Sequence, residues 1–278
     1  MFQLIEHVET IRKTMGRTIS QKRKSELGQF MTPATVARFM ASLFSPSTMK
    51  IMRLLDAGAG IGSLTCAFLD RFALEGQGSR KIEVAAFEID SDLRERFLQT
   101  MADYQNTFIT DTSVFRGDFI EEGVRLILNG KPRFTHAILN PPYKKINSRG
   151  RHRRLLRHVG IETVNLYSAF VALVVELMEP GGEVVAIIPR SFCNGPYYRP
   201  FRDLILAKTA IRRIHLFGAR NRAFKDDGVL QENIIIMLVR EGTQGDITIS
   251  TSTDDLFTDT SVASRKFIHI MRPTASPS

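Results

Sequence analysis

Short apolar runs alternate with amphipathic segments from residue 51 onward, and this alternation restricts the fold more than any other feature of the chain. Such runs are typical of strands buried on both faces of a parallel sheet, and the segments between them have helical spacing. The expected strands are residues 52–55, 82–87, 136–139, 184–189, 211–217 and 233–239, of which the last two should pair antiparallel. The expected helices are residues 64–72, 92–104, 119–128, 166–178 and about 198–206. The sequence therefore predicts an α/β fold.

The two ends of the chain differ from this central part. Leu4, Ile5, Val8 and Ile11 recur at helical spacing, and Pro33 suits the first turn of a second helix. The last stretch is rich in Ser and Thr, so we expect either a small strand extension or a partly disordered tail there. Three parts follow: an N-terminal helical cap (1–50), an α/β unit (51–240) and a short C-terminal extension (241–278).

A glycine-rich turn, Asp56-Ala57-Gly58-Ala59-Gly60-Ile61-Gly62, follows the first expected strand and precedes a helix. Its glycines permit a tight turn and a close approach of the backbone to a ligand, at the strand end where open α/β sheets bind ligands. The same kind of turn serves several nucleotide ligands, so it does not identify one by itself.

Two acidic residues follow later strands. Glu88 comes after the strand at 82–87, where its carboxylate is suited to accept hydrogen bonds from two ribose hydroxyls. Asp118 comes after a third strand that ends near Phe115, where it is suited to accept from an adenine amino group. A second interpretation is that Asp118 caps the helix that begins at Phe119, and the sequence leaves both open.

The turn from Asp56 to Gly62, the acids Glu88 and Asp118, and Asn140-Pro141-Pro142-Tyr143 match in order and spacing the motifs of class I S-adenosylmethionine-dependent methyltransferases. The resemblance covers roughly residues 28–239 and implies a Rossmann-like fold: a mostly parallel seven-stranded sheet, a C-terminal antiparallel strand and helices on both faces. S-adenosylmethionine is the implied cofactor, and its implied contacts are Asp56, Gly58, Gly60, Gly62, Glu88, Asp118 and Phe119. The chain departs from the family pattern at Ala57, where proline is usual.

The segment Gly28-Gln29-Phe30-Met31-Thr32-Pro33 resembles the element that precedes the glycine turn in gamma-class amino-methyltransferases. In that class it closes over the methionine end of the cofactor, which implies contacts from Phe30 and Thr32. The start of the following helix would favour the cofactor carboxylate, because helix N-termini attract anions. The resemblance thus implies the catalytic domain of a gamma-class adenine-N6 DNA methyltransferase.

The loop that begins at Asn140 fits the chemistry of that class. An exocyclic aromatic amine is a poor nucleophile because its lone pair is delocalised into the ring. If the Asn140 side-chain oxygen and the Pro141 carbonyl accept its hydrogens, the nitrogen becomes more nearly tetrahedral and can attack a methyl group in line. The prolines, Pro142 included, stiffen the loop, and Tyr143 is expected to stack on a base that has left the duplex. Phe224 resembles the family's motif VIII aromatic residue, which supports this base, although a core position would explain it equally.

A basic stretch from Lys144 to His158 follows the loop directly and contains seven Lys or Arg residues and no acid. A charge run is usually a solvated face, but this one is tethered to the loop that must meet the base. We therefore expect it to contact DNA phosphates and to add affinity without reading sequence. The expected contacts are Lys144, Lys145, Arg149, Arg151, Arg153 and Arg154. The net charge of +9 also favours a polyanionic partner.

Cysteine content and hydropathy limit which disulfides, metal sites and membrane spans we expect. Cys66 and Cys193 are too few for a disulfide framework or a zinc cluster, so we expect two buried thiols, no metal and a cytoplasmic protein. No stretch approaches the roughly 20 apolar residues of a membrane span, and the N-terminus lacks the pattern of a signal peptide.

The substrate is less constrained than the chemistry. The same loop occurs in enzymes that methylate a glutamine amide in release factors and in some RNA adenine methyltransferases. The glutamine enzymes lack the element at 28–33, whereas phosphate attraction does not separate RNA from DNA. A non-catalytic binding subunit with this fold is a third alternative.

Residues 241–278 are too short for an independent target-recognition domain, so a partner subunit or a missing C-terminal domain is expected to choose the site on double-stranded DNA, within a restriction-modification or related system.

Overall fold

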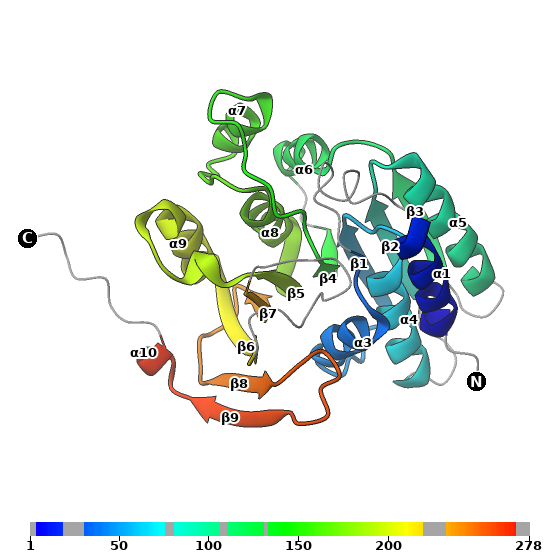
Figure 1. The fold of residues 1–278 in the computed structure, drawn as a ribbon. Coiled ribbons are helices and arrows are strands. Elements are labelled where there is room, and N and C mark those ends of the chain that lie inside the picture. The colour runs from blue at the N-terminus through cyan, green and yellow to red at the C-terminus, as the bar shows by residue number, and fades with distance from the viewer. Residues whose placement is uncertain are drawn as a thin grey trace, which may run out of the picture.

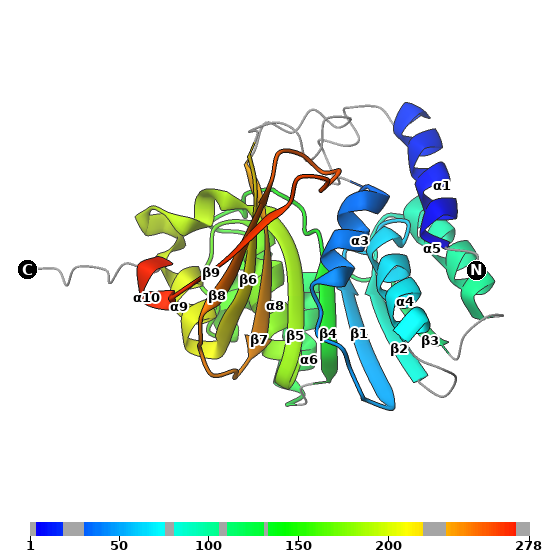
Figure 2. The same ribbon diagram turned by 90° about the horizontal axis from the view of Figure 1, so that it is seen from below.

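The fold is built on one twisted sheet with helices on both faces (Figures 1 and 2). The computed structural model describes residues 4–18, 31–75, 81–105, 110–130, 133–218 and 232–270. The strands are β1 (Ile51–Ala57), β2 (Lys81–Phe87), β3 (Thr110–Phe115), β4 (Phe134–Leu139), β5 (Met178–Pro189), β6 (Thr209–Phe217), β7 (Asn233–Arg240), β8 (Ile247–Ser252) and β9 (Ser261–Arg265). The helices are α1 (Leu4–Thr18), α3 (Ala34–Ser42), α4 (Ser63–Glu75), α5 (Ser91–Gln105), α6 (Phe119–Leu128), α7 (Arg151–His158), α8 (Leu166–Leu177), α9 (Arg199–Lys208) and α10 (Phe267–Ile270).

The strand order is β3-β2-β1-β4-β5-β7-β6-β8-β9. The first five strands in this order are parallel, and β7 lies antiparallel between β5 and β6. The predicted α/β class, the largely parallel sheet and the antiparallel pair at 211–217 and 233–239 are therefore confirmed. All six predicted strands and five predicted helices are present, with ends shifted by a few residues.

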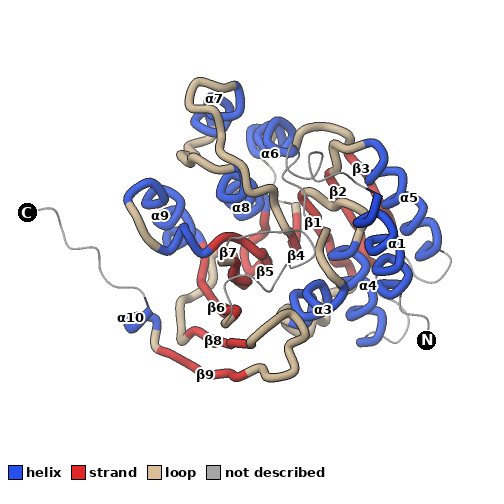
Figure 3. The backbone as a smooth tube through the Cα atoms, viewed as in Figure 1, coloured by secondary structure: helices blue, strands red, loops and turns tan. Residues whose placement is uncertain are grey.

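The core consists of two apolar layers, one on each face of the sheet. Side chains alternate along a strand, so Leu54 packs with α1, α3, α4 and α5, while its neighbour Leu55 packs with α6, α8 and α9. Figure 3 shows the two sets of helices on opposite sides of the strands. Both faces are covered, which explains why the central strands are almost uniformly apolar.

The sheet has two more strands than the predicted seven. β8 pairs parallel with β6, and β9 pairs antiparallel with β8, so the described C-terminal residues take the first of the two expected forms, a strand extension. Ser250 and Ser252 of β8 lie 2.9 Å and 3.1 Å from the two ring nitrogens of buried His215 on β6. These contacts join the extension to the central sheet rather than leaving it as a separate unit.

Two further features differ from the sequence-based expectations or extend them. Cys66 is buried as predicted, but Cys193 is exposed, because it ends the short surface helix η1 (Arg190–Cys193) that follows β5. The basic stretch after Tyr143 folds in part into α7, which packs against α6 (Figure 1). Within the described ranges, no helix is long and apolar enough to cross a membrane. Among the described residues, no group of three or more His, Cys, Asp or Glu side chains could hold a metal ion.

Gly62, between β1 and α4, offers a test of this packing. Its φ is 94°, and a Cβ there would lie 3.0 Å from Cδ2 of Phe97 on α5. Gly62→Ala should therefore lower the free energy of unfolding by about 2–4 kcal/mol, through backbone strain and overpacking combined. Gly130→Ala is the matched control, because its φ is 73° and a Cβ there would meet nothing within 4 Å. It should cost about 1 kcal/mol. Equal losses in chemical denaturation would contradict the packing account.

Candidate functional site

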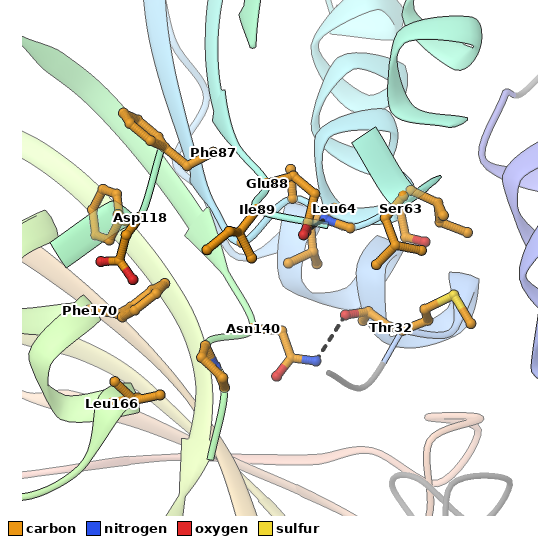
Figure 4. A pocket seen from close by; sticks show the side chains of 18 of the residues that line it. Thr32, Ser63, Leu64, Phe87, Glu88, Ile89, Asp118, Asn140, Leu166 and Phe170 are labelled. Atoms are coloured by element: carbon orange, nitrogen blue, oxygen red, sulfur yellow. Dashed lines mark hydrogen bonds between the residues drawn. The ribbon is translucent and has the colours of Figure 1, made fainter. Parts of the chain in front are cut away.

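A pocket of about 1050 Å³, partly open to solvent, lies where four parallel strands end. Gly58 and Gly60 follow β1, Glu88 follows β2, Asp118 comes shortly after β3, and Asn140 follows β4, and all five residues line it. Figure 4 shows Asp118 and Phe170 on one side of the pocket and Thr32 on the other. The carboxyl ends of parallel strands lie at one edge of a sheet, so residues far apart in the sequence meet there.

The glycine turn presents its backbone to the pocket. The amides of Gly58 and Ala59 both donate to the carbonyl of Phe87, at 2.9 and 3.0 Å, which fixes the turn against the end of β2. The amide of Gly60 donates to Oε2 of Glu88 at 2.9 Å. A Cβ on Gly60 would meet no atom within 4 Å, so the backbone borders open space that a ligand can fill.

Glu88 is held as an acceptor at the centre of the pocket wall. Its Oε1 accepts from the amide of Asp90 at 2.8 Å, and only 4 % of the residue is exposed. Burial raises the pKa of this carboxyl above its ordinary value. The contact of this carboxylate with ribose hydroxyls stays a prediction, which its place in the pocket lining supports.

Asp118 caps a helix and also lines the pocket. Its Oδ1 caps α6 by accepting from the amides of Ile120 and Glu121 at 2.8 and 3.3 Å. Its Oδ2 lies 3.2 Å from Nε2 of His152 on α7. The capping role is therefore observed, and the contact with an adenine amino group stays a prediction.

Aromatic side chains form an apolar wall beside Asp118. Phe119 and Phe170 lie with ring centroids 4.9 Å apart, and Phe87 packs edge-on against Phe119 at 5.1 Å. Phe170 and Leu166 are four residues apart on α8, so they share the helix face that lines the pocket. Sequence reasoning predicted Phe119 but missed Phe170, Leu166, Ile89 and His152, which line the same pocket.

The loop after β4 presents the Asn140 amide in a fixed orientation. Its Nδ2 donates to Oγ1 of Thr32 at 3.2 Å, shown as the dashed line in Figure 4. Its Oδ1 accepts from the hydroxyl of Tyr143 at 3.1 Å, and that hydroxyl is also 3.3 Å from the carbonyl of Ile187. Burial raises the pKa of Tyr143, so the phenol stays protonated and remains a donor. The contacts with Thr32 and Tyr143 thereby hold the amide group at both of its polar atoms.

Some predicted site residues are not part of the pocket lining. Pro142 lines the pocket, whereas Pro141, Tyr143, Asp56 and Gly62 do not. Tyr143 packs edge-on against Tyr167, with ring centroids 6.3 Å apart. Predicted contacts from Phe30 and Phe224 lie outside the described residues.

Asp56 supports the turn from below. It is fully buried, and its Oδ2 accepts from the hydroxyl of Thr65 at 2.6 Å. Its Oδ1 has no hydrogen-bond partner among the residues that the structure describes. Burial raises the pKa of this carboxyl from 3.8 to about 7. Asp56 does not line the pocket, and its predicted contact with a cofactor stays a prediction.

The cations of the basic stretch differ in exposure and in ion pairing, which the sequence alone did not suggest. Arg153 is ion-paired with Glu162, and its side chain is only 11 % exposed, so its predicted role in binding DNA phosphate is corrected to a structural one. Arg151 pairs with Glu121 at 2.9 Å but remains largely exposed. Lys145, Arg149 and Arg154 are exposed. The acids that neutralise the stretch come from other segments, which a search of the stretch alone does not reveal.

The shifted pKa of Asp56 predicts a pH dependence of stability. Between pH 4 and pH 7 this carboxyl ionises in the unfolded chain but keeps its proton in the folded chain, so stability is lost as pH rises through that window. Asp56→Asn removes the titration. The free energy of unfolding of the unmodified chain, minus that of Asp56→Asn, should fall by a few kcal/mol between pH 4 and pH 7.5. A difference that stays constant across this range would contradict the assignment.

Comparisons with known proteins agree with this geometry. The Eco57I restriction-modification methylase family matches residues 48–224. The chain is 52 % identical over 264 residues to the type II methyltransferase M.BsuBI of Bacillus subtilis, and 43 % identical over 246 residues to M.PstI of Providencia stuartii. These matches cover 92 % and 85 % of this chain but 52 % and 48 % of the relatives, so the chain spans about half of their length.

A solved structure extends the comparison to the fold. A Listeria monocytogenes protein assigned to the class I S-adenosylmethionine-dependent methyltransferases superposes with a TM-score of 0.71 at 15 % identity, covering 92 % of this chain and 74 % of that one. The fold and the family imply S-adenosylmethionine as cofactor. The open backbone at Gly60, the acceptors on Glu88 and Asp118, and the aromatic wall fit such a group. Because the family match covers more than half of the chain, the protein belongs to the Eco57I restriction-modification methylases.

Proposed function

We propose that this chain transfers a methyl group from S-adenosylmethionine to the N6 amino group of an adenine in double-stranded DNA, in the cytoplasm, as part of a restriction-modification or related system. The observation that carries the proposal is the Asn140 amide, which lines the pocket and is oriented by Thr32 on one side and Tyr143 on the other. An oriented amide oxygen beside a nucleotide-shaped pocket suits an amine substrate better than a carbon or oxygen nucleophile.

Different residues of the pocket would bind different parts of the cofactor. Glu88 would accept from the ribose hydroxyls, and Asp118 with the aromatic wall would hold the base. The segment at Thr32 and the start of α3 would hold the methionine end, where the helix N-terminus favours a carboxylate. When bound, the cofactor supplies a sulfonium methyl group that is open to nucleophilic attack.

Asn140 would activate the amine. Its Oδ1 accepts one amine hydrogen, and the Pro141 carbonyl accepts the other, which localises the lone pair on nitrogen. The activated nitrogen would then be the nucleophile that takes the methyl group, and the electron pair of the broken carbon–sulfur bond would remain on the cofactor's sulfur. The methylated nitrogen finally releases a proton to water, so no basic side chain is required before attack. Tyr143, together with Phe224, would stack on the flipped base.

Exposed cations beside the loop would bind the DNA backbone. The loop is followed directly by Lys144, Lys145, Arg149, Arg151 and Arg154. Such contacts depend strongly on salt and read no sequence.

We place base recognition in a further domain or a partner subunit. In this proposal residues 1–50 are the cap that carries the cofactor-closing segment, residues 51–240 are the catalytic unit and residues 241–278 are an extension of it. The intact acids and the oriented amide favour this function over a non-catalytic subunit.

The direct test supplies S-adenosylmethionine with a labelled methyl group to the chain together with duplex DNA, RNA or release-factor protein. Label in N6-methyladenosine after digestion of the DNA is the expected result. Label that appears only in RNA or only in protein would replace the proposed substrate. Calorimetry that detects no binding of the cofactor would favour the non-catalytic alternative.

Asn140→Ala should separate chemistry from binding. Loss of the acceptor should lower kcat by at least about 10²-fold while cofactor affinity changes little, because Asn140 acts on the amine. Asn129→Ala is the matched control, since Asn129 is an exposed residue at the end of α6, outside the pocket. Near-normal turnover by Asn140→Ala would show that amine activation does not depend on this amide.

Three exposed cations test the DNA surface. Replacing Lys145, Arg149 and Arg154 together by Ala should weaken duplex binding and reduce the slope of log affinity against log salt by about 2–3. Replacing Lys13, Lys50 and Arg96, which are exposed and do not line the pocket, removes the same charge as a control. Equal weakening by both triple variants would indicate a nonlocal charge effect and refute a specific surface.

A further inference from the structure

His152 contributes a second polar atom to the aromatic end of the pocket. It lies on α7 and lines the pocket, and its Nε2 is 3.2 Å from Oδ2 of Asp118. The adjacent Arg151 pairs with Glu121 of α6 at 2.9 Å, so two successive side chains fasten α7 to the start of α6. These two contacts place the imidazole beside the cap of α6.

The two polar atoms have opposite hydrogen-bonding character. Oδ1 of Asp118 is already occupied by the amides of α6, so Oδ2 is the acceptor that remains for a ligand. A neutral His152 that contacts this oxygen carries its proton on Nε2 and is therefore a donor. The pocket thus holds an acceptor and a donor side by side, next to the apolar wall formed by Phe119 and Phe170.

This arrangement is complementary to one edge of adenine. The amino group donates, and each ring nitrogen beside it accepts. In hypoxanthine, by contrast, an acceptor carbonyl replaces the amino group, and N1 carries a hydrogen. A carboxylate acceptor beside an imidazole donor would therefore match adenine and oppose hypoxanthine, whose carbonyl would face the carboxylate.

We propose that His152 donates from Nε2 to the ring nitrogen beside the amino group of the cofactor's adenine, while Asp118 accepts from the amino group. This inference rests on the proposed cofactor and assigns a base-reading role to a residue of the basic stretch. The base replaces the present contact between His152 and Asp118, so neither polar group loses a partner on binding.

Calorimetry with S-adenosylhomocysteine and its 1-deaza and 7-deaza adenine analogues tests this directly, because each analogue removes one ring acceptor. The unmodified chain should bind one of the two analogues about tenfold more weakly than the parent compound. His152→Ala should bind the parent about tenfold more weakly and should no longer discriminate against that analogue. His152→Gln, which keeps an N–H donor, should recover part of the affinity. His158→Ala, an exposed position on the same helix, is the control.

Several results would overturn the proposal. Equal binding of all three compounds by the unmodified chain would mean that no ring nitrogen is read. Retained discrimination in His152→Ala would assign the donor to another group. Loss of affinity for all three compounds in equal proportion would mean that His152 only positions Asp118. No binding of the parent compound to the unmodified chain would remove the cofactor premise itself, which distinguishes that failure from failure of the His152 assignment.

Discussion

The parallel register of β1, β2 and β3 is the constraint on which the site depends. Ala57 pairs with Phe87, and Phe87 pairs with Phe115, so the three strands end at the same level. β4 continues this edge on the other side of β1. Because the strands end level, the glycine turn, Glu88, Asp118 and Asn140 open onto one pocket. A shift of one residue in any of these strands would turn its side chains to the opposite face and move its strand-end residue out of the pocket.

The Asn140 amide connects the two ends of that pocket. Thr32 belongs to the segment expected to close over the methionine end, and Tyr143 belongs to the loop expected to meet the base. One side chain is therefore held by Thr32 at one polar atom and by Tyr143 at the other. An amide held at both atoms is preorganised, so little rotational freedom remains to be lost when the amine arrives.

Much of the fold could be predicted because burial leaves a regular pattern. The apolar runs of β1, β4 and β5 reflect coverage of the sheet on both faces, and the glycine turn, Glu88 and Asp118 come at strand ends where topology places ligands. What sequence reasoning missed depends on contacts between distant segments. In the sequence, Phe170 cannot be told apart from the core residues of α8. Arg153 is ion-paired with Glu162, which lies outside the basic stretch. The contact of Asp56 with Thr65 of α4 was also missed, because the sequence does not say which way a carboxylate points.

The central claim is that the pocket at the strand ends holds the cofactor with its reacting end beside Asn140. A crystal structure with S-adenosylhomocysteine tests this most directly. The account predicts the ribose hydroxyls on Glu88, the base between Asp118 and the Phe170 wall, and the sulfur facing the Asn140 side. A cofactor bound away from Glu88, or one whose sulfur faces away from Asn140, would contradict it.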